Sequence, residues 1–411
     1  MCLSRILLCF IFSTYSFAAE LPSALPEKMG LSSERLEQIN RVISKNIEAG
    51  SIQGAITAVA RGDHVVHFQT HGLMDVEKNI PMQRDAIFIM MSSTKPILGV
   101  AAMIAIEEGW FRPQDPVSRY IPELTNMSVA VLKEPRDVNV SPESVRRSEI
   151  PEHRLVPSDR EVTIHDILTH TSGIMSGGLG SAISKRGPRA TLKQYIPTLG
   201  NAILDFQPGT RWKYSPGTAL DVIARIIEIK SGKSYDEFLK QRIFNPLDMV
   251  DTHYNLPASK ESRRVVISGR DMSRFRNSNT TYFSGSYGLS STARDYLRFE
   301  QMLANGGKLG ETRILSPRTV EIFASNQVGD LYSGLRNGQK GMGFGYTVAV
   351  TEDSITSGGR RSKGAFGWGG AFGTRSWTDP AEDLSAVLML QQPHGRTQYE
   401  FENAIRQAII E

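Results

Sequence analysis

Strand-like segments lie towards both ends of this 411-residue chain, and a long stretch of helical pattern separates them. Near the N-terminus, residues 55–60 and 65–68 have the composition of strands, and the Arg-Gly-Asp between them suits a tight hairpin turn. Strand patterns return towards the other end, at residues 344–350, 365–372, 375–378 and 385–390. The pattern therefore predicts one sheet built from both chain ends.

Helical periodicity accounts for much of the rest. Residues 33–49 carry Leu36, Ile39, Ile43 and Ile47 at the spacing of one helix face, and further helices are expected at residues 292–303 and 399–410. The middle of the chain has helical stretches divided by loops, at residues 163–168, 192–195, 218–231 and 235–243. We expect a sheet subdomain at about residues 26–112 and 279–411, and an inserted, mostly helical subdomain at about residues 113–278.

Two polar segments interrupt the predicted helical subdomain. Residues 125–160 are charged and lack clear periodicity, and residues 175–189 are rich in glycine, serine and basic residues. Long segments without periodicity are unusual inside a compact domain, so we expect residues 125–160 to form a surface excursion. Both a cover over a cleft and a loop without function remain open for it.

Residues 1–18 have the pattern of a secretory signal peptide. Arg5 supplies a positive charge, residues 6–17 are mostly apolar, and small residues precede an expected cleavage after Ala18. Both cysteines, Cys2 and Cys9, lie in this leader. The mature protein, residues 19–411, is therefore expected to be periplasmic or secreted, without disulfides, and stabilised by its core alone. About 390 residues are enough for such a core.

The charge balance excludes some partners. The formal net charge is +4, and the lysines and arginines are scattered rather than gathered in one stripe, so nucleic acid is not an expected partner. Beyond the leader no apolar run reaches the roughly 18 residues that a spanning helix needs. We expect no integral membrane segment in the mature chain and a small molecule as substrate. The oligomeric state stays open.

The tetrad Ser-Ser-Thr-Lys at residues 92–95 stands between two apolar runs, at the predicted start of a helix. Pro96 suits a first helical turn, and Gly109 marks the end of the apolar stretch. Residues three apart at a helix start share a face. A hydroxyl is a poor nucleophile at neutral pH unless a base is in reach, and a partly buried lysine can supply one. Taken alone, however, the tetrad better fits an N-cap with a solvated lysine.

Two further segments strengthen the interpretation of the tetrad as a site. Residues 207–217, Gln-Pro-Gly-Thr-Arg-Trp-Lys-Tyr-Ser-Pro-Gly, form a predicted rigid turn that presents Tyr214 just before a helix. Residues 367–373, Gly-Trp-Gly-Gly-Ala-Phe-Gly, form a glycine-dense stretch with strand-like flanks. Glycines in a strand permit close approach of a ligand or another backbone. Exposed N–H groups there could bind an oxyanion, each donor contributing roughly 3 kcal/mol to acyl transfer.

The order Ser-x-x-Lys, Tyr-x-x and glycine-rich strand resembles the serine β-lactamase and penicillin-binding protein superfamily. The resemblance is closest to its class C-like branch, which includes the β-lactamase-like (family VIII) carboxylesterases. Residues 162–173, 243–249 and 289–295 look like further landmarks of that branch, and the resemblance runs from about residue 30 to the C-terminus. It implies the β-lactamase/DD-peptidase-like fold, of class α/β plus α: an antiparallel sheet flanked by helices, with an inserted, mostly helical subdomain.

Carried over motif by motif, the resemblance implies a serine hydrolase that forms an acyl-enzyme on Ser92, which water then attacks. Lys95 would be the general base, and Tyr214 would complete the proton shuttle. The oxyanion hole would be the backbone N–H groups of Ser92 and Ala371. No metal or organic cofactor is implied. The substrate-binding region would also include Pro216, Trp368, Gly369 and Gly370.

Two departures from the lactamase pattern concern the substrate. The second motif usually ends in asparagine, but Pro216 has no side-chain donor, and Trp368 replaces the lysine or histidine that usually begins the third motif. Losing a charge-assisted hydrogen bond costs roughly 1.5 to 3 kcal/mol, which disfavours a lactam. Arg375 could restore a cation nearby, or it could point to solvent. Because Trp-Gly-Gly also looks like the esterases, we expect a carboxylesterase acting on small esters.

Two rival functions stay open. One is a β-lactamase or D-amino-acid peptidase acting on cell-wall peptides. The other is an inactive peptidoglycan-binding or ligand-binding homologue, which would not need the serine, lysine and tyrosine all intact. His165 and His170 are interpreted as structural, because the chain has no Gly-x-Ser-x-Gly elbow. Their spacing of five, with no glutamate beside either, also fails to fit a helical metal pair.

Overall fold

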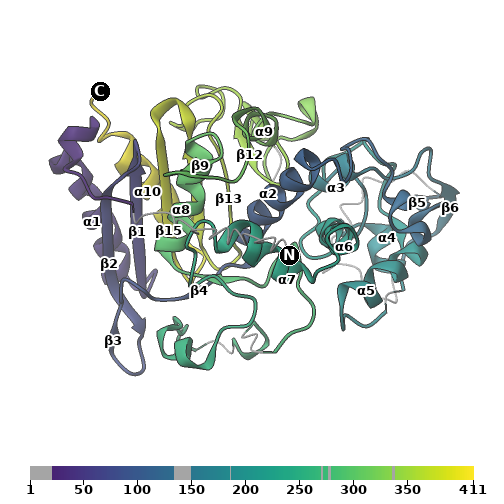
Figure 1. Cartoon of the computed structure of the whole chain (residues 1–411), viewed down its shortest axis with the longest axis horizontal. Coiled ribbons are helices and arrows are strands. Elements are labelled where there is room, and N and C mark those ends of the chain that lie inside the picture. The colour runs from purple at the N-terminus through teal and green to yellow at the C-terminus, as the bar shows by residue number, and fades with distance from the viewer. Residues whose placement is uncertain (1–20, 134–149, 186, 270–271, 276–278, 336–337) are drawn as a thin grey trace, which may run out of the picture.

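The main sheet contains strands from both ends of the chain. The structure, a computed structural model, describes residues 21–133, 150–185, 187–269, 272–275, 279–335 and 338–411. All neighbouring strands are antiparallel, in the order β11-β12-β13-β14-β15-β1-β2-β3. Figure 1 shows purple N-terminal strands beside yellow C-terminal ones, and Ile56 of β1 lies opposite Met389 of β15. The predicted sheet built from both chain ends is confirmed. Its strands are β1 (Gly54–Arg61), β2 (His64–Asp75), β3 (Ile80–Pro81), β11 (Met342–Phe344), β12 (Ala349–Thr351), β13 (Phe366–Gly369), β14 (Arg375–Asp379) and β15 (Leu384–Met389).

Helices cover both faces of this sheet, and alternate residues of β1 face different cores. Ala55 and Val59 pack in the core beneath α1 (Ser33–Glu48) and α10 (Gly395–Arg406). Ile56 and Ala58 belong to the larger core that contains residues of α2 (Thr94–Glu107) and α8 (Ala293–Ala304). Because β1 is covered on both faces, its buried residues from Gly54 to Ala60 are all small or apolar.

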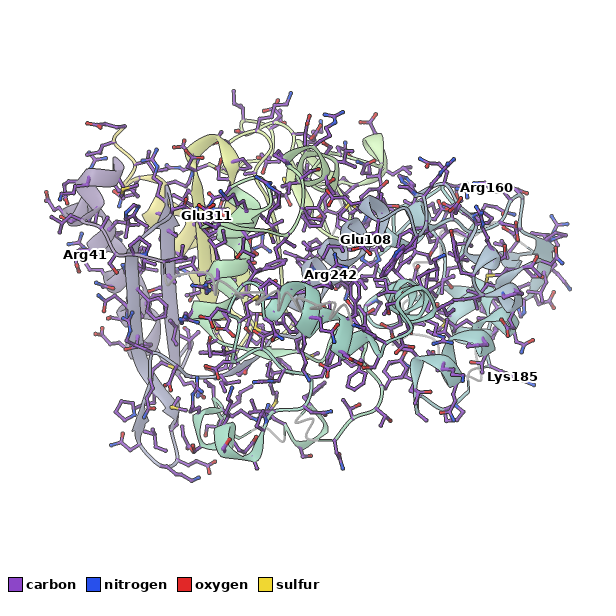
Figure 2. The ribbon with its side chains drawn as sticks, viewed as in Figure 1. Arg41, Glu108, Arg160, Lys185, Arg242 and Glu311 are labelled. Atoms are coloured by element: carbon purple, nitrogen blue, oxygen red, sulfur yellow. The ribbon has the colours of Figure 1, made fainter. Side chains whose placement is uncertain are left out.

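The mostly helical region lies on the α2 side of the molecule, as Figure 1 shows. Its largest helix, α6, packs against α2. A π-helical turn, Lys240–Phe244, follows α7, and an ion pair of 2.5 Å between Arg242 of this turn and Glu108 links it to the end of α2 (Figure 2). The helices here are α3 (Ile164–Leu168), α4 (Leu179–Ile183), α5 (Leu192–Tyr195), α6 (Ala219–Ser231) and α7 (Tyr235–Leu239), and α9 (Pro317–Phe323) comes later in the chain.

Two segments differ from the sequence-based expectation. The predicted single strand at residues 344–350 is wrong: Thr347, with φ of 75°, lies in a turn between β11 and β12. Within residues 125–160 the structure forms β5 (Ser128–Leu132) and β6 (His153–Pro157), which join β7 (Ile203–Leu204) in a small sheet. The residues of β6 are only partly buried or exposed, so no apolar alternation marks it. The remaining short strands are β4 (Phe88–Ile89) with β8 (Ser290–Ser291), and β9 (Lys308–Leu309) with β10 (Thr312–Arg313).

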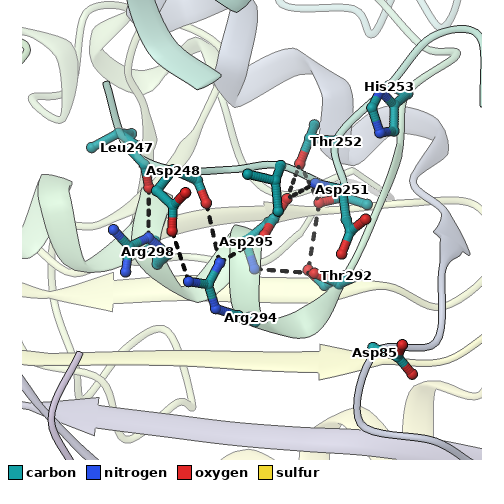
Figure 3. Close-up of polar contacts among 12 residues, drawn as sticks. Asp85, Leu247, Asp248, Asp251, Thr252, His253, Thr292, Arg294, Asp295 and Arg298 are labelled. Carbon is teal, nitrogen blue, oxygen red and sulfur yellow. Dashed lines mark hydrogen bonds and ion pairs between the residues drawn. The ribbon is translucent and has the colours of Figure 1, made fainter. Parts of the chain in front are cut away.

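Two of the sequence landmarks, residues 243–249 and 289–295, meet in space (Figure 3). Thr292 caps α8 by accepting from the backbone N–H of Asp295. The Asp295 carboxylate in turn accepts from the Asp251 N–H at 2.7 Å, and burial raises its pKa to about 6. Arg294 pairs with Asp248 at 2.8 Å. The polar residues of these motifs therefore join the helical region to the start of α8.

The predicted leader, residues 1–18, lies outside the described residues, so its cleavage remains a prediction. In the described parts of the chain, no helix combines the length and the apolar character needed to cross a bilayer.

Candidate active site

Ser92 lies at a sharp junction between β4 and α2. It belongs to the 3-10 turn Met91–Ser93, and the residue before it, Met91, has a φ of 47°. This left-handed conformation is strained for a side chain other than glycine and persists only where the surroundings enforce it. Ser92 is partly exposed, whereas the next three residues are buried. The turn therefore leaves the hydroxyl accessible while the helix behind it enters the core.

Lys95 is completely buried, at 0% exposure, and its Nζ lies 3.4 Å from Ser92 Oγ. The same amine donates to two backbone carbonyls, those of Pro216 and Ser286, each at 2.9 Å. These two carbonyl contacts fix the amine beside the serine.

Tyr214 completes the group from the loop that leads into α6. Its Oη lies 2.8 Å from Ser92 Oγ, and Lys95 Nζ lies 4.8 Å from the centre of its ring. The structure therefore brings together the serine, lysine and tyrosine that the sequence singled out from segments 122 residues apart. The hydroxyl oxygen has a basic group on one side and a phenol on the other.

An aromatic cluster holds Tyr214 in place. Trp368 of β13 packs against its ring with centroids 5.6 Å apart, and Trp212 stacks on it at 6.4 Å. Phe344 and Tyr332 close the cluster, the latter 4.6 Å from Trp212. Trp368 is only 4% exposed, so its indole mainly supports the tyrosine, and little of it is available to a substrate.

His170 also touches Tyr214, edge to face at 4.9 Å. Burial, followed by the electrostatic effect of the nearby Lys95 amine, holds the pKa of His170 well below the usual value, so the imidazole is neutral. Its Nδ1 accepts from the Ser215 N–H at 3.3 Å. His165 lies elsewhere, with its Nδ1 3.2 Å from Tyr346 Oη. Neither histidine hydrogen-bonds to Ser92.

The glycine-rich segment approaches the turn that carries Ser92 very closely. A Cβ on Gly370 would lie 2.2 Å from the Met90 carbonyl oxygen, so only glycine fits there. Thr374 fastens the contact, because its Oγ1 donates to the Met90 carbonyl at 3.2 Å and shares a hydrogen bond of 2.9 Å with Ser93 Oγ. Ala371 follows in an exposed turn. Within the described residues, neither its N–H nor that of Ser92 has an acceptor.

Gly369 and Arg375 lie opposite each other on β13 and β14. The arginine stem packs where a Cβ on Gly369 would be, with Cδ 3.2 Å from that point. Burial, followed by repulsion from Arg361, lowers the pKa of Arg375 to about 10. No hydrogen bond or ion pair joins its guanidinium to any residue that the structure describes.

Sequence reasoning missed the groups that hold the lysine. Pro216 was noted for lacking a side-chain donor, yet its carbonyl binds Lys95, as does that of Ser286. The fully buried Asp221 of α6 accepts from Tyr282 Oη at 2.6 Å, and from Ser284 Oγ at 2.6 Å and the Ser286 N–H at 3.2 Å. A backbone carbonyl has no sequence signature. The buried aspartate at a helix start was the one available signal.

No cluster of three or more His, Cys, Asp or Glu side chains suited to a metal ion occurs among the described residues.

Comparison with known proteins identifies the family. The model of the β-lactamase family matches residues 39–409. An uncharacterised protein of Mycobacterium tuberculosis is 31% identical over 84% of this chain and 87% of its own length. Esterase EstB of Burkholderia gladioli is 27% identical over 90% of this chain and 94% of its own. The solved structure of EstCE1, a hydrolase with promiscuous acyltransferase activity, superposes with a TM-score of 0.73 at 24% identity, covering 91% and 99% of the two chains.

Proposed function

Because this chain belongs to the β-lactamase family, on its esterase-like branch, we propose that it is a carboxylesterase that acts on small esters through an acyl-enzyme on Ser92. One observation carries the proposal. Lys95 Nζ and Tyr214 Oη converge on Ser92 Oγ, at 3.4 and 2.8 Å. A serine in reach of a base and of a second proton carrier is the arrangement that nucleophilic catalysis requires.

The reaction begins when Ser92 Oγ attacks the ester carbonyl and loses its proton to the Lys95 and Tyr214 pair. Tyr214 then protonates the departing alcohol, a role that the distance of 2.8 Å between its Oη and Ser92 Oγ supports. Water then attacks the acyl carbonyl and gives a proton to the same two groups. These groups return a proton to Ser92 Oγ as the carboxylic acid leaves. The close hold on Lys95 by two carbonyls keeps its amine near the serine through both steps.

The free N–H groups of Ser92 and Ala371 would bind the oxyanion of each tetrahedral intermediate. The close approach of Gly370 to the Met90 carbonyl supports this role. It fixes the turn that follows β13, residues 370–373 (the β13 turn), against the turn that carries Ser92. Each such donor contributes roughly 3 kcal/mol to an acyl-transfer transition state.

Three features favour esters over lactams. Trp368 stands where the family usually has a cation and is mostly covered by aromatic neighbours. Pro216 offers only a carbonyl, which Lys95 already occupies. Esterase EstB, whose similarity to this protein covers 90% of this chain, is named for esterase activity. We further propose that the protein is exported, from the leader pattern at residues 1–18.

Parallel assays test the proposal. Purified protein is given a short p-nitrophenyl ester and a chromogenic cephalosporin, with the Ser92→Ala variant as control. We expect ester turnover that depends on Ser92 and exceeds cephalosporin turnover by at least tenfold. Faster cephalosporin turnover would favour the lactamase or peptidase function. Turnover of neither, with no fluorophosphonate adduct on Ser92, would favour a binding protein.

A further inference from the structure

The amine of Lys95 is held by two segments from different parts of the chain. Pro216 supplies one carbonyl and Ser286 the other. Only the backbone of these residues touches the lysine, so their positions depend on whatever fixes each segment. We refer to residues 282–287 as the base-holding loop.

Arg189 bridges the two segments one residue beyond the carbonyls. One guanidinium nitrogen, Nη2, donates to the Gly217 carbonyl at 2.8 Å and to Thr218 Oγ1 at 2.5 Å. The other, Nη1, donates to Tyr287 Oη at 2.9 Å. A planar guanidinium can serve both directions at once, which an ammonium cannot do with the same geometry. The two segments also touch directly, because a Cβ on Gly217 would lie 3.3 Å from the Tyr287 ring.

Asp221 holds the same loop from the inside. Its carboxylate accepts from Tyr282, Ser284 and the backbone N–H of Ser286. The peptide of Ser286 thus stands between a buried carboxylate, bound to its N–H, and the Lys95 amine, bound to its carbonyl. Three hydrogen bonds to this one buried side chain fix the geometry of the loop.

We propose that Asp221 and Arg189 are positioning residues for the general base. Asp221 binds the base-holding loop, and Arg189 joins this loop to the segment that follows Pro216. Together these bonds fix the Ser286 and Pro216 carbonyls on Lys95. Neither residue contacts Ser92. Arg189 lies in the glycine-rich and basic segment, residues 175–189, for which the proposed reaction gives no other role. This inference rests on the proposed acyl-enzyme function.

The test compares Arg189→Gln and Arg189→Lys with wild type and with Arg119→Gln. Arg119 is an exposed arginine, and its ion pair is with Asp115 rather than with a residue of the base-holding loop. Arg189 is an exposed residue, so its variants are expected to fold. The readouts are the rate of Ser92 acylation by a saturating short p-nitrophenyl ester, the ester concentration giving half that rate, and the melting temperature.

We expect Arg189→Gln to lower the saturating acylation rate about tenfold. The ester concentration that gives half of that rate should change by less than about twofold. Arg189→Lys is expected to restore little, since a lysine cannot bridge both segments. Arg119→Gln should acylate at the wild-type rate. Tyr287→Phe combined with Arg189→Gln should cost no more than Arg189→Gln alone, because both remove the same bond. Asp221→Asn should slow acylation at least as strongly.

The positioning role would be overturned if Arg189→Gln acylated Ser92 at the wild-type saturating rate, or if only the half-saturating ester concentration changed. Additive effects of Arg189→Gln and Tyr287→Phe would also overturn it. These outcomes differ from failure of the proposed function, in which wild-type protein itself would give no Ser92 adduct.

Discussion

Replacing Gly370 with alanine tests how the β13 turn and the serine turn fit together. A Cβ there would lie 2.2 Å from the Met90 carbonyl oxygen and 2.3 Å from Thr374 Oγ1. Ordinary contacts begin near 3.4 Å, so the two turns must separate by about 1 Å. The separation would also stretch the Thr374 bonds to Met90 and Ser93.

The size of the effect follows from that displacement. Overpacking of this kind lowers the free energy of unfolding by about 1–3 kcal/mol. A misplacement of about 1 Å at reacting groups can lower a rate by about a hundredfold. The Ala371 N–H, the next group along the chain, would move away from Ser92. We therefore expect Gly370→Ala to slow ester turnover by about a hundredfold while remaining folded.

The assay measures turnover of a short p-nitrophenyl ester together with thermal unfolding. Gly395→Ala is the matched control, because nothing lies within 4 Å of the position its Cβ would take. That control should keep both properties. Wild-type turnover by Gly370→Ala would refute the assignment of the β13 turn to the oxyanion hole. Loss of stability without loss of turnover would refute it equally.

Three further predictions concern the proton shuttle, the core and the leader. Tyr214→Phe keeps the aromatic packing but removes the hydroxyl 2.8 Å from Ser92, so Ser92 acylation should fall by about 10²–10³ with little change in melting temperature; acylation within threefold of wild type would contradict the shuttle. Burial raises the pKa of Glu300 to about 7, above its ordinary value of 4.5, despite hydrogen bonds from Ser376 and Thr378. The folded protein therefore holds this proton more readily, and the free energy of unfolding should fall as pH rises from about 4.5 to about 7, by up to about 1.4 kcal/mol per pH unit. Glu300→Gln should make that slope, measured by urea unfolding, shallower; an unchanged slope would count against the raised pKa. Finally, intact mass of protein recovered from an exporting host should correspond to a chain beginning at Ala19, whereas a retained leader would contradict export.

The sequence predicted those parts of the molecule that depend on side-chain type and spacing. Alternation and turn residues located β1, β2, β13, β14 and β15, and their separation in the chain predicted the shared sheet. The Ser-x-x-Lys spacing and the tyrosine turn identified Ser92, Lys95 and Tyr214, and the structure places the lysine amine and the tyrosine hydroxyl within 3.4 Å of Ser92 Oγ. Each of these signals is a property of particular residue types.

Other parts depend on backbone geometry, which residue type does not reveal. The turn at Thr347 needed a left-handed backbone at a residue that rarely adopts one, so a continuous strand was expected there. The hold on Lys95 by Pro216 and Ser286 uses carbonyls, which every residue has. The bridge made by Arg189 joins segments 28 and 98 residues away along the chain, and no local pattern encodes it.

The central claim is that Ser92 carries the acyl group. Protein mixed with a short p-nitrophenyl ester, quenched in acid during turnover and digested, should yield one peptide heavier by the acyl group, with the modification on Ser92. The Ser92→Ala variant should give no such peptide and no turnover above background. Turnover that persists in Ser92→Ala, or an acyl group found on another residue, would contradict the account.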